Sequence, residues 1–135
     1  MNESSRPWPE RLRTIAAISV GGFLGANARF SVGMWAAERW GSTFPWGTLL
    51  INVTGSFVLG LYLTVVTERF AGRPATRLFV ATGFLGAFTT FSTFSYETVR
   101  LLESGAAIVA LAYVATSLMF GLIAAVAGVL CAHAF

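Results

Sequence analysis

The chain has 135 residues, of which 56% are hydrophobic and only 11% are charged; its nine basic residues are all Arg and its six acidic residues are all Glu. A soluble domain carries about 25% charged residues, so this composition excludes an ordinary soluble enzyme, and the scattered Arg residues form no basic patch for a nucleic acid. The single Cys131 and single His133 exclude an intrachain disulfide, a Cys-based metal site and a His-centred catalytic site. We therefore expect a membrane protein that has no enzyme activity and binds no nucleic acid.

Charged residues divide the chain into four apolar segments, each close to the roughly 20 residues that a helix needs to cross a bilayer. The predicted helices cover about 14–37, 47–67, 78–100 and 105–132. Together they use most of the sequence and leave no room for a soluble domain. The predicted fold is an all-α, multi-pass membrane protein with one four-helix transmembrane domain over residues 1–135.

The Arg residues are unevenly divided between the two ends of these helices. With four crossings, both termini and the second loop share one side, which holds Arg6, Arg11, Arg13, Arg69, Arg73 and Arg77. The other side holds Arg39 and Arg100. Because basic residues favour the cytoplasmic side of a membrane, we predict cytoplasmic termini.

Small residues and one Arg share a face of the first predicted helix. Gly21, Gly25, Arg29 and Gly33 are each four positions apart, a spacing that aligns them along one side. We expect the glycines to allow close packing against another helix. Arg29 has two interpretations: it extends toward lipid headgroups, or it attracts anions to the mouth of a pore.

The second predicted helix, which contains the sequence GTLLINVTGSFVLG, carries hydroxyl and amide side chains on one face. Thr48, Asn52 and Ser56 are again four residues apart. Hydrogen bonds between helices, at about 1 kcal/mol each in a membrane, explain Thr48 and Ser56 well. The Asn52 amide offers two N–H donors and an acceptor, so it is at least as well suited to line a polar path.

The third segment, ATGFLGAFTTFSTFSYE, is the most informative part of the chain. Its two glycines and six Ser or Thr residues are poorly suited to one continuous membrane helix. We predict a broken helix, interrupted near 86–93, whose freed carbonyls must be satisfied by protein, water or a cation. Phe88, Phe91 and Phe94 recur at intervals of three through this break. Because a Phe ring has a positive edge, Phe91 and Phe94 can bind a dehydrated anion without the tight hold of a full charge.

The fourth segment and the acidic residues narrow the possible mechanisms. Tyr113 and Ser117 are four residues apart, so their hydroxyls can extend the lining that Asn52 begins. No acidic residue lies within the first, second or fourth segment, and Glu97 stands at the end of the third. A proton-coupled exporter of the small multidrug type needs a carboxylate inside the membrane, so this alternative is disfavoured. An assembly subunit of a larger complex would explain the packing glycines but not the TTFSTF segment.

Three motifs in order, GGFLGANARF, WGTLLINVTGSFVLG and GFLGAFTTFSTFSYE, resemble the Fluc (CrcB) family of fluoride channels. The resemblance covers about residues 18–128, and its third motif is the most specific. It implies a dual-topology, antiparallel homodimer of four-helix subunits in membrane lipid, with two fluoride pores built from both subunits. It also implies a structural sodium ion on the two-fold axis. The implied function is passive export of cytoplasmic fluoride across the inner membrane, which lowers fluoride toxicity.

The same resemblance implies roles for individual residues. The sodium ion falls on the backbone carbonyls of Gly86 and Thr89. The pore and fluoride-binding residues correspond to Phe91, Phe94, Asn52, Ser92, Thr93, Ser117, Arg29 and Glu97, which Tyr113 joins through its spacing from Ser117. The Arg excess on one side fits poorly with two opposite orientations, so a heterodimer with an oppositely oriented homologue is the alternative to a homodimer.

Overall fold

The computed structural model describes residues 7–68 and 74–134, and every regular element within these ranges is helical. In chain order these elements are α1 (Trp8–Trp40), α2 (Trp46–Glu68), α3 (Pro74–Arg77), the π-helical segment η2 (Leu78–Leu85), α4 (Gly86–Phe88), α5 (Phe91–Glu103) and α6 (Ala107–Ala134). Four stretches are long and apolar enough to cross a membrane: Trp8–Trp40, Trp46–Thr67, Ala75–Glu103 and Ala107–Ala134. The structure confirms the predicted all-α fold class with four membrane-capable helices.

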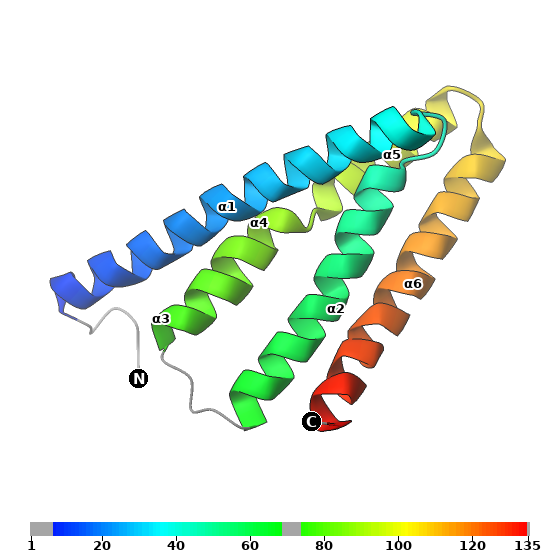
Figure 1. The fold of residues 1–135 in the computed structure, drawn as a ribbon. Coiled ribbons are helices and arrows are strands. Elements are labelled where there is room, and N and C mark those ends of the chain that lie inside the picture. The colour runs from blue at the N-terminus through cyan, green and yellow to red at the C-terminus, as the bar shows by residue number, and fades with distance from the viewer. Residues whose placement is uncertain (1–6, 69–73, 135) are drawn as a thin grey trace.

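The four long stretches run alternately up and down, and α1 crosses the others obliquely (Figure 1). α2 and α6 lie side by side, while η2 packs against α1. The loop between α1 and α2 and the turn between α5 and α6 lie at the same end of the bundle (Figure 1). α5, which contacts both α2 and α6, therefore places the second half of the third stretch at this end.

Glycines bring α1 and η2 into very close contact. A Cβ atom built on Gly21 would lie 2.3 Å from the carbonyl oxygen of Phe79, and one built on Gly25 would lie 2.1 Å from that of Phe84. These two glycines have the packing role that the sequence predicts. Gly33 also lies where two helices approach closely, since a Cβ atom built on Gly47 would lie 3.1 Å from the Gly33 Cα, although a Cβ atom on Gly33 itself would meet nothing within 4 Å in the described part of the chain.

The π-helical form of η2 was not predicted from the sequence. Over its eight residues, Leu78–Leu85, the apolar pattern does not distinguish a π-helix from an α-helix. The N–H of Gly86 marks the end of the wide turns, since it reaches the carbonyls of both Ala81 and Gly83. Short π-helical segments occur often at functional sites, and only the short α4 separates this one from the interruption of the third membrane helix.

The close contact between α1 and η2 predicts a sharp difference between two neighbouring glycines. Gly25→Ala is expected to destabilise the protein by about 1–3 kcal/mol, the usual cost of overpacking, because the new methyl group meets backbone that has no room to move. Gly22→Ala is the matched control, since its Cβ would meet only the carbonyl oxygen of Gly83 at 3.9 Å. The midpoints of thermal unfolding in detergent measure the difference. Equal midpoints for the two variants would contradict this packing.

Candidate functional site

The third membrane helix is interrupted at two residues with extended backbones, Thr89 (φ −75°, ψ 156°) and Thr90 (φ −152°, ψ 115°). The helix resumes because Thr90 caps α5: its Oγ1 accepts a hydrogen bond of 3.1 Å from the N–H of Thr93. The same Oγ1 donates to Thr93 Oγ1 at 2.9 Å and lies 3.3 Å from Ser92 Oγ. Thr90 organises the break, although the sequence analysis did not assign it to the site. A Thr at the start of an expected helix is the signal that identifies such a cap.

Asn52 on α2 holds the extended segment. Its Oδ1 accepts the N–H of Thr90 at 2.8 Å, and its Nδ2 donates to the Thr90 carbonyl at 3.0 Å. Both main-chain groups of a residue that has left the helix are thus satisfied, as a membrane interior requires. Asn52 therefore has the interhelical bonding role that was the alternative to lining a path, and its specific partner, the Thr90 backbone, was not predicted. An amide carries two N–H donors, and the second has no recorded partner among the described residues.

The break leaves several carbonyls without their helical donors, among them those of Gly86 and Thr89. In a continuous helix the N–H of Thr90 would donate to the Gly86 carbonyl, and that of Thr93 to the Thr89 carbonyl. Here these N–H groups donate to Asn52 Oδ1 and Thr90 Oγ1 instead. Hard cations prefer oxygen ligands, so the residues assigned to a sodium ion from the sequence fit such an ion.

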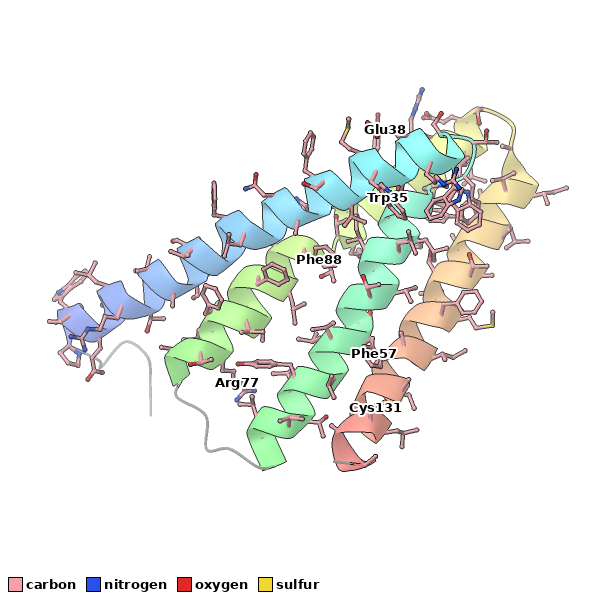
Figure 2. The ribbon with its side chains drawn as sticks, in the orientation of Figure 1. Trp35, Glu38, Phe57, Arg77, Phe88 and Cys131 are labelled. Atoms are coloured by element: carbon pink, nitrogen blue, oxygen red, sulfur yellow. The ribbon has the colours of Figure 1, made fainter. Side chains whose placement is uncertain are left out.

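Phe91 and Phe94 lie next to each other on α5, with ring centroids 5.7 Å apart and planes inclined by 42°. Phe94 is half-buried and its ring lies 5.2 Å from that of Tyr113, whereas Phe91 is 76% exposed. Phe88 does not join this pair. It stacks on Phe84 with centroids 5.9 Å apart, and Figure 2 shows it at the end of α4. The interval of three fails to align Phe88 with the other two rings because the chain is extended between them.

An open groove of about 270 Å³ is lined by both Phe rings of α5. Asn52, Ser117 and Thr90 also line it, together with Phe91 and Phe94. The Oγ of Ser117 is buried and has no hydrogen-bond partner within the described residues. This groove therefore combines two Phe rings, an unpaired hydroxyl and an amide N–H, groups of the kinds that can replace the water around a small anion.

A second open groove, of about 570 Å³, contains the charged side chains. Arg29, Thr93 and Glu97 line it, and Thr90 belongs to the linings of both grooves. In residues 7–68 and 74–134, the structure records no ion pair for Arg29. Its charge is therefore available to attract anions into this groove.

Glu97 accepts hydrogen bonds from hydroxyl groups on two other helices. Thr48 Oγ1 on α2 donates to one carboxylate oxygen at 3.0 Å, and the Tyr113 hydroxyl on α6 donates to the other at 2.7 Å. Both donors are buried, with Thr48 only 7% and Tyr113 0% exposed. The predicted interhelical hydrogen bonding of Thr48 is thus confirmed. Its partner, Glu97, connects α5 to both α2 and α6 through these two hydrogen bonds.

The predicted pore residues are not all gathered into the grooves. Ser92 lines neither groove and lies beside Thr90. Tyr113 also lines neither and instead lies buried against Phe94 and Glu97. The remaining predicted residues divide between the two: Phe91, Phe94, Asn52 and Ser117 in the smaller, and Arg29, Thr93 and Glu97 in the larger.

Comparison with known proteins identifies the family. A family model described as "CrcB-like protein, Camphor Resistance (CrcB)" matches residues 16–129. The chain belongs to the CrcB family. All residues of both grooves and of the break fall within the matched range of this CrcB chain.

Three relatives of this CrcB chain carry the name fluoride-specific ion channel FluC. The relative from Roseiflexus sp. (strain RS-1) is 48% identical over 108 residues, which cover 80% of this chain and 87% of the relative. That from Acidobacterium capsulatum is 50% identical over 107 residues, covering 79% and 86%. That from Chloroflexus aurantiacus is 45% identical over 118 residues, covering 87% and 94%. The resemblance to the Fluc (CrcB) family is thus confirmed, and the named relatives are channels, which gives no support to an exporter.

Proposed function

We propose that this protein is a fluoride-specific channel through which cytoplasmic fluoride leaves the cell passively across the inner membrane, so that fluoride toxicity falls. The observation that carries the proposal is the smaller groove, which joins two Phe rings, the Asn52 amide and the free hydroxyl of Ser117 at the helix break without any charged residue in its lining. Fluoride is small and strongly hydrated, so donors along the path must replace its water. The names of the relatives support this choice of ion.

The proposed path uses both grooves. Arg29 attracts fluoride into the larger groove, where the hydroxyl of Thr93 and the first turn of α5 offer hydrogen-bond donors. The ring edges of Phe91 and Phe94 then carry the ion past the break, with Asn52 and Ser117 as donors. A full positive charge is absent from this stretch, so the ion is bound loosely enough to leave.

Three further residues act beside the path. Tyr113 and Glu97 form a hydrogen-bonded pair next to Phe94, and the Tyr113 hydroxyl acts by holding the Glu97 carboxylate in place beside the path. The hydroxyl of Ser92 stands beside Thr90 at the start of α5. Ser92 is exposed and follows Phe91, which is 76% exposed, so its hydroxyl is a donor toward a second subunit.

Two copies of the chain complete the channel in this proposal. A single chain leaves Phe91 exposed and both grooves open, so one copy does not enclose a path through the membrane. An antiparallel, dual-topology homodimer with two pores in membrane lipid encloses the rings of each chain against the other. A heterodimer with an oppositely oriented homologue is the alternative that suits the unequal distribution of Arg.

A structural sodium ion at the dimer axis belongs to the same proposal. The carbonyls of Gly86 and Thr89, which lack their helical donors, would hold it. When bound, the ion supplies the positive charge that the freed carbonyls of two facing breaks require. Gly86 lies on the exposed surface of the chain, so its carbonyl can reach a site shared with a second subunit.

Reconstitution in liposomes tests the function directly. Vesicles loaded with fluoride or chloride and containing the purified protein are expected to release fluoride rapidly, without a proton gradient, and to retain chloride. Ion-selective electrodes record both anions. Proton-driven transport of a lipophilic cation would identify an exporter instead, and silence toward all of these ions would indicate an assembly subunit.

Removal of sodium is expected to impair the channel by loosening the dimer. When sodium is replaced on both sides of the membrane by a bulky organic cation, fluoride efflux should fall and chemical crosslinking should detect more monomer. Potassium provides a control for cation size. Full flux and an intact dimer without sodium would overturn the sodium site while leaving the channel itself unaffected.

A further inference from the structure

Phe44, in the loop between α1 and α2, contacts the buried ring of Tyr113. The two ring centroids lie 5.4 Å apart and the planes are inclined by 83°, which is an edge-on contact. Phe44 also lies 4.6 Å from the ring of Trp46 at the start of α2. The Tyr113 ring is therefore held by a loop residue in addition to Phe94, which lies 5.2 Å away on α5.

The position of the Tyr113 hydroxyl depends on the tilt of this ring. Tyr113 is 0% exposed, and a ring in a close-packed interior turns only when its neighbours move. Its hydroxyl donates to Glu97 at 2.7 Å, and a small change of tilt would lengthen this bond. Phe44 is the ring neighbour that does not come from α5, so it limits the tilt independently of the helix that carries Phe94.

The loop that carries Phe44 is itself held by aromatic contacts. The ring centroids of Trp35 and Trp40 lie 5.0 Å apart, and those of Trp40 and Trp46 lie 6.0 Å apart. Figure 2 shows Trp35 near the end of α1, close to this loop. These successive ring contacts hold the loop in place at one end of the bundle. Trp residues are also typical of membrane–water interfaces.

We propose that Phe44 is a positioning residue for fluoride conduction, whose ring fixes the orientation of Tyr113 and so keeps the Tyr113 hydroxyl on Glu97. This inference rests on the proposed function. Phe44 lines the larger groove but not the smaller groove that contains Phe91 and Phe94. Its effect on the ring-lined part of the path therefore passes through Tyr113.

Two substitutions of Phe44 test its ring. Phe44→Leu keeps an apolar side chain but removes the edge-on contact, and it is expected to slow fluoride efflux from liposomes roughly three- to ten-fold, the range that an aromatic pair supports. Phe44→Tyr keeps the ring and should conduct as the wild type does. Phe23→Leu, the same change at a 68% exposed position on α1, is the matched control. An unchanged rate for Phe44→Leu would overturn the inference.

A double-mutant cycle separates positioning from a general weakening of the loop. Tyr113→Phe removes the hydroxyl but keeps the ring, and it should slow efflux by itself. If Phe44 acts through that hydroxyl, Phe44→Leu has no further effect in the Tyr113→Phe protein. Additive losses, or an unchanged rate for Tyr113→Phe, would overturn the inference even when the wild type conducts fluoride. A wild type that conducts no fluoride would instead overturn the proposed function, together with everything that rests on it.

Discussion

Replacing Phe94 with Ile is expected to lower fluoride flux by roughly 100-fold, which corresponds to the loss of about 3 kcal/mol of stabilisation of a desolvated ion. Ile keeps the apolar character and much of the volume of Phe but offers no positive ring edge. Phe94 lines the smaller groove and contacts both Phe91 and Tyr113, so its substitution affects the ring-lined path directly. Efflux from liposomes, recorded with a fluoride electrode, measures the change.

The control for Phe94→Ile is the same change at Phe120. This residue lies on α6, is 46% exposed and lines neither groove. Phe120→Ile should conduct fluoride at the wild-type rate, and both variants should elute from a sizing column as the wild type does. A Phe94→Ile protein that conducts normally would remove the ring edges from the mechanism.

Replacing Asn52 with Leu is expected to destabilise the protein enough to abolish flux. Leu has the branching and the number of side-chain heavy atoms of Asn but cannot bond the N–H and the carbonyl of Thr90, which Asn52 contacts at 2.8 and 3.0 Å. Each buried main-chain group left unsatisfied costs about 1–3 kcal/mol, so the pair removes a large part of the roughly 5–15 kcal/mol by which a protein is stable. The midpoint of thermal unfolding in detergent and the yield of dimer measure this loss.

Asn27→Leu is the matched control for Asn52→Leu. Asn27 lies exposed on α1, and among the described residues its Nδ2 donates within its own helix, to the carbonyl of Phe23 at 2.7 Å. That carbonyl belongs to an α-helix, so it keeps its main-chain partner when the amide is lost. We expect the midpoint of Asn27→Leu to stay near that of the wild type. An equal fall in the unfolding midpoint for the two variants would show that the hydrogen bonds of Asn52 do not stabilise the break.

Most residues of the site could be predicted from the sequence, but the hydrogen bonds and ring contacts between them could not. Seven of the nine residues predicted to line a path fall into two grooves that meet at Thr90, whereas Ser92 and Tyr113 line neither. Asn52 was expected either to line a path or to bond another helix, and most of its amide binds Thr90. Phe44 was not singled out, because an aromatic residue in a short loop gives no periodic signal.

The sequence alone determined the four membrane-capable helices and the interruption of the third. Both follow from local chemistry, because transfer of about 20 apolar residues into a bilayer stabilises a helix whatever its neighbours, and clustered Gly, Ser and Thr weaken one. The tertiary structure decided which carbonyls are freed, which hydroxyls bind Glu97 and where the rings point. These features depend on hydrogen bonds between residues 38 and 49 positions apart, from Asn52 to Thr90 and from Thr48 to Glu97. Such bonds form only once the packing of α2 against α5 and α6 has brought distant parts of the chain together.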